Sequence, residues 1–154
     1  MGGDDVTTIY KLTRRDLTTY NGFLYEIGKT YHFSGTGLLC GPGYSHAYLS
    51  PQLALLLNPI HGGYQPCRLW RASGIIAARD HELKVGCSEI TLEHEIIAPK
   101  VTTEQRVTFA LWCAMAVHTD PDFYAWAEDW LNGEDRSART ARAASWAAPT
   151  DKDG

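Results

Sequence analysis

The sequence lacks the marks of secreted, membrane and disulfide-rich proteins. Its four cysteines, at positions 40, 67, 87 and 113, form no Cys-x-x-Cys pair, and we expect them to be free thiols. The first five residues contain neither the basic nor the apolar segment of a secretory signal. The longest apolar run, residues 109–117, is far too short to cross a bilayer. We therefore expect a soluble protein with no membrane partner.

A basic charge excess and the common catalytic motifs are also missing. The net charge of −4 makes nucleic acid an unlikely partner, because nucleic-acid binders are basic over much of their surface. The sequence contains no G-x-S-x-G, H-E-x-x-H or Walker-type glycine motif, and its cysteines and histidines match no common zinc spacing. We therefore predict no catalytic residues, no metal site and no cofactor, and we lean towards a protein that is not an enzyme.

What the sequence does contain is enough apolar material for one core. Hydrophobic residues make up 44% and charged residues 21% of the 154 residues, which are ordinary globular values. Residues 7–98 are rich in Gly, Thr, Tyr and β-branched residues, whereas residues 102–148 are rich in Ala and Trp. This contrast predicts an α+β fold, in which a small mixed or antiparallel sheet packs with two to three C-terminal helices. We expect a single domain over 1–154, with a loose tail at 149–154.

Alternating apolar residues and turn signals predict the strands of the first half. The candidates are residues 7–11, 23–27, 29–33, 67–72 and 89–96. Gly28 marks a tight turn or bulge, and the alternation of the last candidate slips at His94. Residues 35–43 contain four glycines and a proline and predict a loop. The Ser-Pro pair at 50–51 predicts the start of a short helix over 52–57.

Helix signals follow from residue 102 onward. Thr102 and Gln105 have the spacing of a capping box before an apolar run. Asp120 precedes a proline in the same cap-plus-Pro manner, and Gly133 is the expected end of that helix. The apolar faces expected for the two helices are Val107, Ala110, Leu111, Ala114 and Met115, and Phe123, Trp126, Ala127, Trp130 and Leu131. Residues 134–147 predict a third helix rich in Ala and Arg.

Aromatic and basic residues of the helical half are the candidate binding residues. Three arginines recur every three residues, and such a guanidinium stripe either binds carboxylates, phosphates or an acidic partner surface, or remains a solvated helix face. The tryptophans either fill the core or anchor a contact with another chain. The candidates are Trp126, Trp130, Arg136, Arg139, Arg142 and Trp146.

Four segments of the first half carry a resemblance to a known family. They are Tyr10-Lys11, Gly-Phe-x-Tyr-Glu-x-Gly-Lys-Thr-Tyr at 22–31, Cys-x-x-Gly-Tyr-x-His-Ala at 40–47 and Cys-Ser-Glu-Ile at 87–90. Over residues 9–98 the chain resembles an uncharacterised domain family of bacteriophage and prophage genomes that carries no established activity. Relatives tend to carry a second cysteine shortly after the histidine, where this chain has Ala47 and Tyr48, so a shared Cys–His–Cys site is not implied.

The resemblance implies a phage or prophage gene product that acts in a virion or in the host bacterial cytoplasm. Together with the missing catalytic motifs, it leads us to predict a non-catalytic protein that acts through protein–protein contacts. Its partner is another protein, such as a virion protein, or a second copy of itself. It is either a virion (capsid-associated) component or a host-directed accessory factor.

Two alternatives remain open at the level of sequence. The first is an ADP-ribosyltransferase-like enzyme that uses NAD, in which Tyr44, Ser45 and His46 precede a helix. Its late-strand acid is Glu93, with Glu89 and Glu95 as the other acids that fit the pattern. The second is a nucleic-acid accessory protein that uses the arginine stripe, which the acidic net charge places last.

Overall fold

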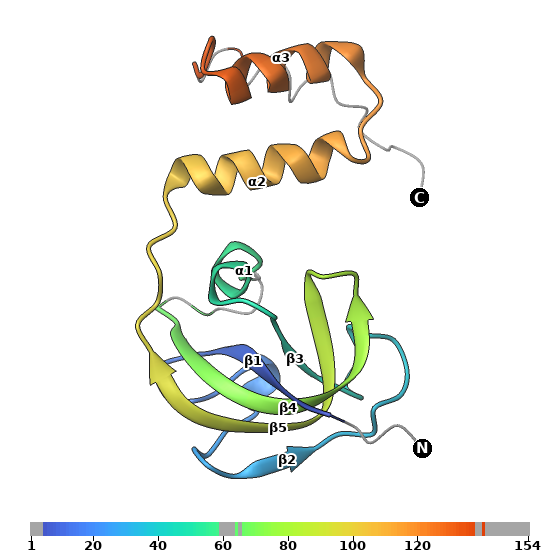
Figure 1. The fold of residues 1–154 in the computed structure, drawn as a ribbon, viewed down its shortest axis with the longest axis vertical. Helices are drawn as coiled ribbons and strands as arrows, with labels where there is room; N and C mark the ends of the chain where they lie inside the picture. Colours follow the sequence, from blue (N-terminus) through green and yellow to red (C-terminus); the bar gives the residue numbers. More distant parts are fainter. Residues whose placement is uncertain (1–4, 59–63, 65, 138–139, 141–154) are drawn as a thin grey trace. The chain divides into compact units, whose positions relative to one another are not determined.

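The computed structural model of the chain describes residues 5–58, 64, 66–137 and 140 (Figure 1). The chain divides into two compact units, residues 1–101 and residues 102–154. The first contains a five-stranded antiparallel sheet and a short helix, and the second contains two further helices, so the predicted α+β fold is confirmed. The expectation of a single domain stays a prediction.

The sheet of the first unit is built on one long hairpin. Strand β4 (Arg68–Asp80) pairs with β5 (Lys84–Ile96), and the two curve together along their whole length (Figure 1). Strand β1 (Val6–Thr13) pairs with the outer side of β4. Strand β5 pairs with β2 (Thr30–His32) over its middle and with β3 (Ser45–Ala47) near its start. All of these pairings are antiparallel.

Two backbone hydrogen bonds close this sheet on itself. The N–H of Tyr10 donates to the carbonyl of Tyr48 at 2.8 Å, and the N–H of Tyr48 donates to the carbonyl of Tyr10 at 2.9 Å. Because Tyr48 is the residue that follows β3, the strands form a ring in the order β1, β4, β5, β3 and back to β1. Strand β2 lies outside this ring, on β5. Closure satisfies backbone groups that would otherwise lie on open edges and encloses an interior.

Register shifts bend the hairpin so that this ring can close. Opposite Arg71 and Ala72, strand β5 contributes His94 and Leu92, which leaves Glu93 as the extra residue of a bulge. Two further shifts lie on either side of Ile76. Bulges increase the local bend and twist of a strand pair. The slip in alternation at His94 is therefore the sequence trace of this bend.

The sheet encloses an apolar core. Its fully buried side chains include those of Ile9, Trp70, Val85, Ile90 and Leu92. The indole N–H of Trp70 donates to the hydroxyl of Thr13 at 3.0 Å, so this buried polar atom has a partner.

The strand predicted at residues 23–27 is wrong, whereas the other four strand predictions are confirmed. In that segment Leu24 forms one isolated bridge, and Tyr25 donates its backbone N–H to Leu17 within the same loop. The apolar residues that predicted a strand here belong to an aromatic cluster instead. The ring of Phe23 lies 4.9 Å from that of Tyr25 and 5.7 Å from that of Phe33, between centroids.

Helix α1 (Pro51–Leu56) begins where the sequence predicts. The hydroxyl of its N-cap, Ser50, accepts the backbone N–H of Leu53 at 3.1 Å. The glycine-rich segment at 35–43 contains no regular helix or strand, as expected.

The second unit is a pair of helices with the predicted caps. Helix α2 (Thr103–Met115) opens with the full capping box of Thr102 and Gln105. Helix α3 (Pro121–Asn132) starts after Asp120 and ends at Gly133, whose φ of 82° is left-handed. Their shared core consists of the buried residues Leu111, Phe123, Ala127 and Trp130. Residues 134–137 are not helical, and the remainder of the predicted third helix, apart from Thr140, lies outside the described residues.

Candidate functional site

A cavity of about 890 Å³ opens in the first unit. Proteins hold nucleotide-sized and drug-sized molecules in cavities of this volume. Its walls come from Lys11 on β1, from the loop at 19–25, from the segment 40–48 and from the hairpin end at 80–84. The aromatic residues of its lining are Tyr20, Phe23, Tyr25, Phe33, Tyr44, Tyr48 and Tyr64.

Lys11 is the unusual residue of this cavity. It lies on the same face of β1 as the core residue Ile9, and its side chain is only 6% exposed. Its ammonium donates a hydrogen bond to the backbone carbonyl of His46 at 2.5 Å and lies 5.5 Å from the ring centre of Tyr25. Within the described part of the chain, no carboxylate forms an ion pair with it. A buried lysine without a carboxylate is costly to keep charged.

Burial lowers the pKa of Lys11 from 10.5 to about 8. The side chain is therefore still mostly protonated at neutral pH. The thiol of Cys87 does not supply a counter-charge, because burial raises its pKa to about 11 and keeps it neutral. A positive charge thus remains in a poorly hydrated environment, where electrostatic attraction to an anion is strongest.

His46 is neutral beside this charge. Burial is the main reason that its pKa is lowered, and the nearby positive charges of Lys11 and Lys84 add to the effect. Its Nε2 lies within hydrogen-bond reach of the carbonyl of Leu39. A carbonyl only accepts, so the proton of the neutral imidazole is on Nε2 and Nδ1 is an acceptor.

Two tyrosines of the cavity are held in their neutral form. The hydroxyl of Tyr25 lies 2.8 Å from that of Ser45, and burial raises the pKa of Tyr25. Burial also raises the pKa of Tyr48 to about 12. These phenols therefore add no negative charge to the cavity.

A second lysine lies at the hairpin end of the cavity. The ammonium of Lys84 donates to the sulfur of Cys40 at 3.1 Å. Among the described lining residues, Asp80 is the one carboxylate, and its Oδ1 is 3.2 Å from Nδ1 of His81. The cavity therefore has a buried positive charge at Lys11 and both signs of charge near its hairpin end.

The structure brings together three of the four residues of the predicted enzyme site. Tyr44, Ser45 and His46 all line the cavity, but Glu93 does not. The carboxylate of Glu93 accepts a hydrogen bond from Arg71 at 2.7 Å at the bulge of the hairpin. The NAD-using alternative is therefore left without its predicted acid in the cavity.

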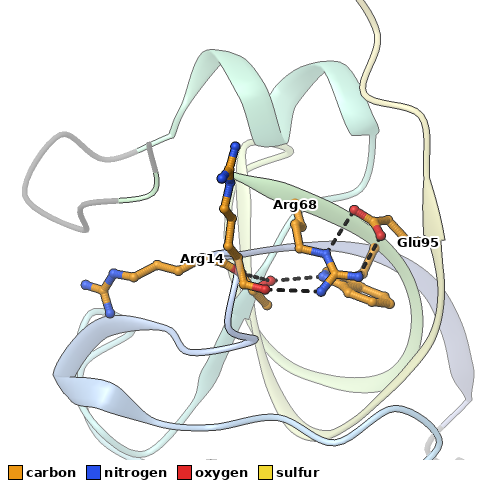
Figure 2. Close-up of polar contacts among 6 residues, drawn as sticks. Arg14, Arg68 and Glu95 are labelled. Atoms are coloured by element: carbon orange, nitrogen blue, oxygen red, sulfur yellow. Dashed lines mark hydrogen bonds and ion pairs between the residues drawn. The ribbon is translucent and has the colours of Figure 1, made fainter. Parts of the chain in front are cut away.

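Glu95, another acid considered for that alternative, is also engaged elsewhere. Arg68 donates to its two carboxylate oxygens at 3.0 and 2.7 Å, and also to the carbonyl of Arg15 at 3.2 Å. Figure 2 shows Arg68 reaching Glu95, with Arg14 on its other side. The guanidinium also lies 4.6 Å from the ring centre of Trp70. This arrangement ties β4 to β5 and to the turn after β1, which is a structural role.

The candidate residues of the helical half divide between the core and the undescribed tail. Trp130 is 9% exposed and belongs to the core of the helix pair, and Trp126 packs against that core. Arg136 donates to the carbonyl of Trp130 at 3.0 Å and to Glu104 at 2.7 Å. The arginine therefore links α2 to the end of α3. Arg139, Arg142 and Trp146 lie outside the described residues.

Helix α2 and the two residues after it present a second apolar surface, which we call the outer face of α2. It consists of Phe109, Ala110, Trp112, Cys113, Ala116 and Val117. Trp112 is 62% exposed and Val117 is 82% exposed, and none of the six residues is charged. The exposed Arg106 lies on the same side of the helix, one turn before Phe109 and Ala110. The opposite side of α2, with Val107, Leu111, Ala114 and Met115, is the side that packs with α3.

The two most informative residues, Lys11 and Trp112, are absent from the sequence-based candidates. Lys11 lies two residues from both Ile9 and Thr13 in a strand, so all three side chains are expected on the same face. This spacing was the signal available in the sequence. Trp112 lies outside the apolar stripe that was assigned to α2, so its helical position already separated it from the core.

No family model, curated protein or solved structure matches the chain. Across the described residues, every helix is too short or too polar to cross a membrane. The same residues contain no group of three or more His, Cys, Asp or Glu side chains placed to hold a metal ion.

Proposed function

We propose that the protein is non-catalytic and works through protein–protein contacts, with the outer face of α2 as its contact surface. The observation that carries this proposal is the exposure of Trp112, at 62%, at the edge of an apolar face that also includes the exposed Cys113, Ala116 and Val117. Tryptophan is the residue type that most often dominates the binding energy of protein interfaces. A contiguous apolar face of this kind is typical of a surface that another protein covers.

A second copy of the chain is the partner that best fits this face. Two helices of 13 and 12 residues bury only four side chains between them, and a second copy would bring the number of helices to that of a four-helix bundle. In a two-fold dimer the same patch meets itself, so any charge on it would face a like charge. The six residues of the outer face of α2 carry none, and the nearest charge on that side, Arg106, lies one turn before Phe109 and Ala110.

The resemblance to phage proteins supports a place in a virion or in the infected bacterium. Mass spectrometry of purified phage particles distinguishes the two settings. Recovery of the chain in a fixed ratio to the major capsid protein identifies a virion component. Its absence from particles identifies a host-directed accessory factor.

Sedimentation equilibrium of the full chain tests the contact surface. We expect a mass near twice 17.1 kDa. Trp112→Ala should weaken self-association at least tenfold, because truncation of a central interface tryptophan commonly costs about 2 kcal/mol or more. The matched control is Leu38→Ala, which removes an 85% exposed apolar side chain of the first unit and should leave the mass unchanged. A monomer at every concentration would overturn the choice of a second copy as partner.

The exposed thiol of Cys113 gives an independent test of which face is used. It lies on the outer face of α2, so mild oxidation should join two chains through Cys113 if the faces meet about a two-fold axis. Cys113→Ser should abolish the cross-linked dimer, whereas Cys40→Ser, which removes the other exposed thiol, should not. Cross-linking that depends on Cys40 instead would contradict the proposed face.

A further inference from the structure

The cavity of the first unit points to a function that lies outside the proposed contact surface. We propose that it binds a small organic anion that carries a planar ring. The Lys11 ammonium pairs with the anionic group, and the exposed side chains of Tyr20 and Phe23 contact the ring. The site lies wholly within residues 11–84, so it does not depend on the outer face of α2.

The anionic group follows from the unused hydrogen-bond donors and the unpaired charge of Lys11. An ammonium has three N–H donors, and one of them is used by the carbonyl of His46. In the described part of the chain this is its one hydrogen-bond acceptor, although the ring of Tyr25 adds a weak cation–π contact. The groups that face it, His46 and Cys87 among them, are neutral at pH 7. An anion in the cavity supplies both the missing charge and the missing acceptor.

The planar ring follows from the aromatic side chains that line the cavity. Tyr25 bonds to Ser45, Tyr48 donates to the carbonyl of Leu57 at 3.3 Å, and Tyr64 accepts the N–H of Tyr20 at 3.1 Å. These three tyrosines are buried, so the ring surface open to a ligand comes from Tyr20 and Phe23 of the lining, which are 59% and 38% exposed. Aromatic surfaces bind planar rings by stacked or edge-to-face contact.

The volume of the cavity sets the size of the ligand. A space of about 890 Å³ is far larger than one inorganic phosphate needs and accommodates a mononucleotide. A phosphate and a carboxylate meet the requirement of Lys11 equally well. The shared chemistry is therefore an anionic group joined to a ring, and the choice between the two anions is left to the measurement.

Calorimetric titration of the full chain tests the pairing with Lys11. The probes are AMP and benzoate as ring anions, adenosine as a neutral ring, and inorganic phosphate as an anion without a ring. We expect AMP or benzoate to bind at least tenfold more tightly than adenosine or phosphate, and whichever binds identifies the anion. Lys11→Met should abolish this advantage, whereas Lys29→Met, which removes an exposed lysine paired with Glu26, should retain it. Equal binding of AMP and adenosine would overturn the role of Lys11.

Chemical labelling gives a second readout that does not require tight binding. Pyridoxal 5′-phosphate carries a ring, a phosphate and an aldehyde. The unprotonated amine of a lysine attacks the aldehyde carbon and water leaves, and borohydride then delivers a hydride to the imine carbon to fix a secondary amine. We expect peptide mapping to find the label first on Lys11 rather than on Lys29, Lys84 or Lys100, and the tighter-binding ring anion to protect it. Label spread over the exposed lysines, together with no heat from any ring anion, would refute the site.

Discussion

At the scale of single residues, Lys11 is a position where the fold is less stable than it needs to be. An apolar side chain of similar length fits the interior of the ring without the cost of a buried charge. Proteins keep such costs mainly where a side chain acts on something other than the fold. We therefore infer that Lys11 is retained for the cavity and not for the stability of the core.

The pH dependence of stability should reveal this cost. Because the pKa of Lys11 is about 8 in the folded chain and 10.5 for a solvent-exposed lysine, the unfolded chain binds more protons between these two pH values. The penalty is therefore complete below pH 8 and disappears as the pH rises to about 10.5. This penalty amounts to about 3 kcal/mol. A substitution that removes the charge also removes the hydrogen bond to His46, which offsets about 1 kcal/mol of the gain.

Lys11→Met should accordingly raise the free energy of unfolding at pH 7 by about 2 kcal/mol. The gain should shrink as the pH approaches 10. Urea unfolding of both proteins at pH 7, 8.5 and 10 measures the difference at each pH. A difference that stays constant across this range would show that the lysine is not buried as a charged group.

At the scale of secondary-structure elements, local signals were sufficient where the chemistry is local. The caps at Ser50, Thr102 and Asp120 all lie within three residues of the N–H groups that they accept, and all were predicted. The strand prediction for residues 23–27 was wrong because aromatic residues are common both in strands and in aromatic clusters of loops.

The contacts between distant segments that form the candidate site could not be predicted from the sequence. The bridge from Tyr10 to Tyr48 joins residues 38 positions apart, and no periodicity encodes it. The charge of Lys11 predicts an exposed position. The closure of the sheet places it in the interior instead. Tyr44, Ser45 and His46 were identified from their sequence context, but the partner that the structure gives them is Lys11 rather than Glu93.

The capping box provides a test at this scale. Thr102→Ala should destabilise α2 by about 1 kcal/mol, because it removes the acceptor of the Gln105 N–H. Hydrogen exchange should accelerate about fivefold in the amides of α2 and remain unchanged in β4 and β5. Thr103→Ala, one position further on, keeps the cap and is the matched control. Equal effects of the two variants would contradict a capping role.

At the scale of the whole molecule, the two units differ in how they achieve a core. The strand unit buries large side chains on a closed ring of strands, including Trp70, Leu69 and Ile90. The described part of the helical unit has four buried residues in its core and leaves Trp112 exposed. Its stability should therefore depend on association in a way that the stability of the strand unit does not.

Thermal unfolding at several protein concentrations tests this dependence. The transition of the helical signal at 222 nm should move to higher temperature as the concentration rises, by several degrees for each hundredfold increase, because only the folded helices dimerise. The shift should vanish in Trp112→Ala and persist in Leu38→Ala. A concentration-independent transition in the unmodified chain would argue against dimerisation through α2.

The closure between Tyr10 and Tyr48 also dictates an order of events during synthesis. Strand β1 is made first, but its ladder partner, residues 68–75 of β4, emerges from the ribosome much later. Until then Lys11 remains in water with an ordinary pKa. The ring is completed by β5, whose final residue is Ile96, so a nascent chain halted before β5 contains the α1 sequence but no closed ring and no cavity. Ligand binding during translation would therefore begin abruptly, after the last strand leaves the exit tunnel and before the helical unit is complete.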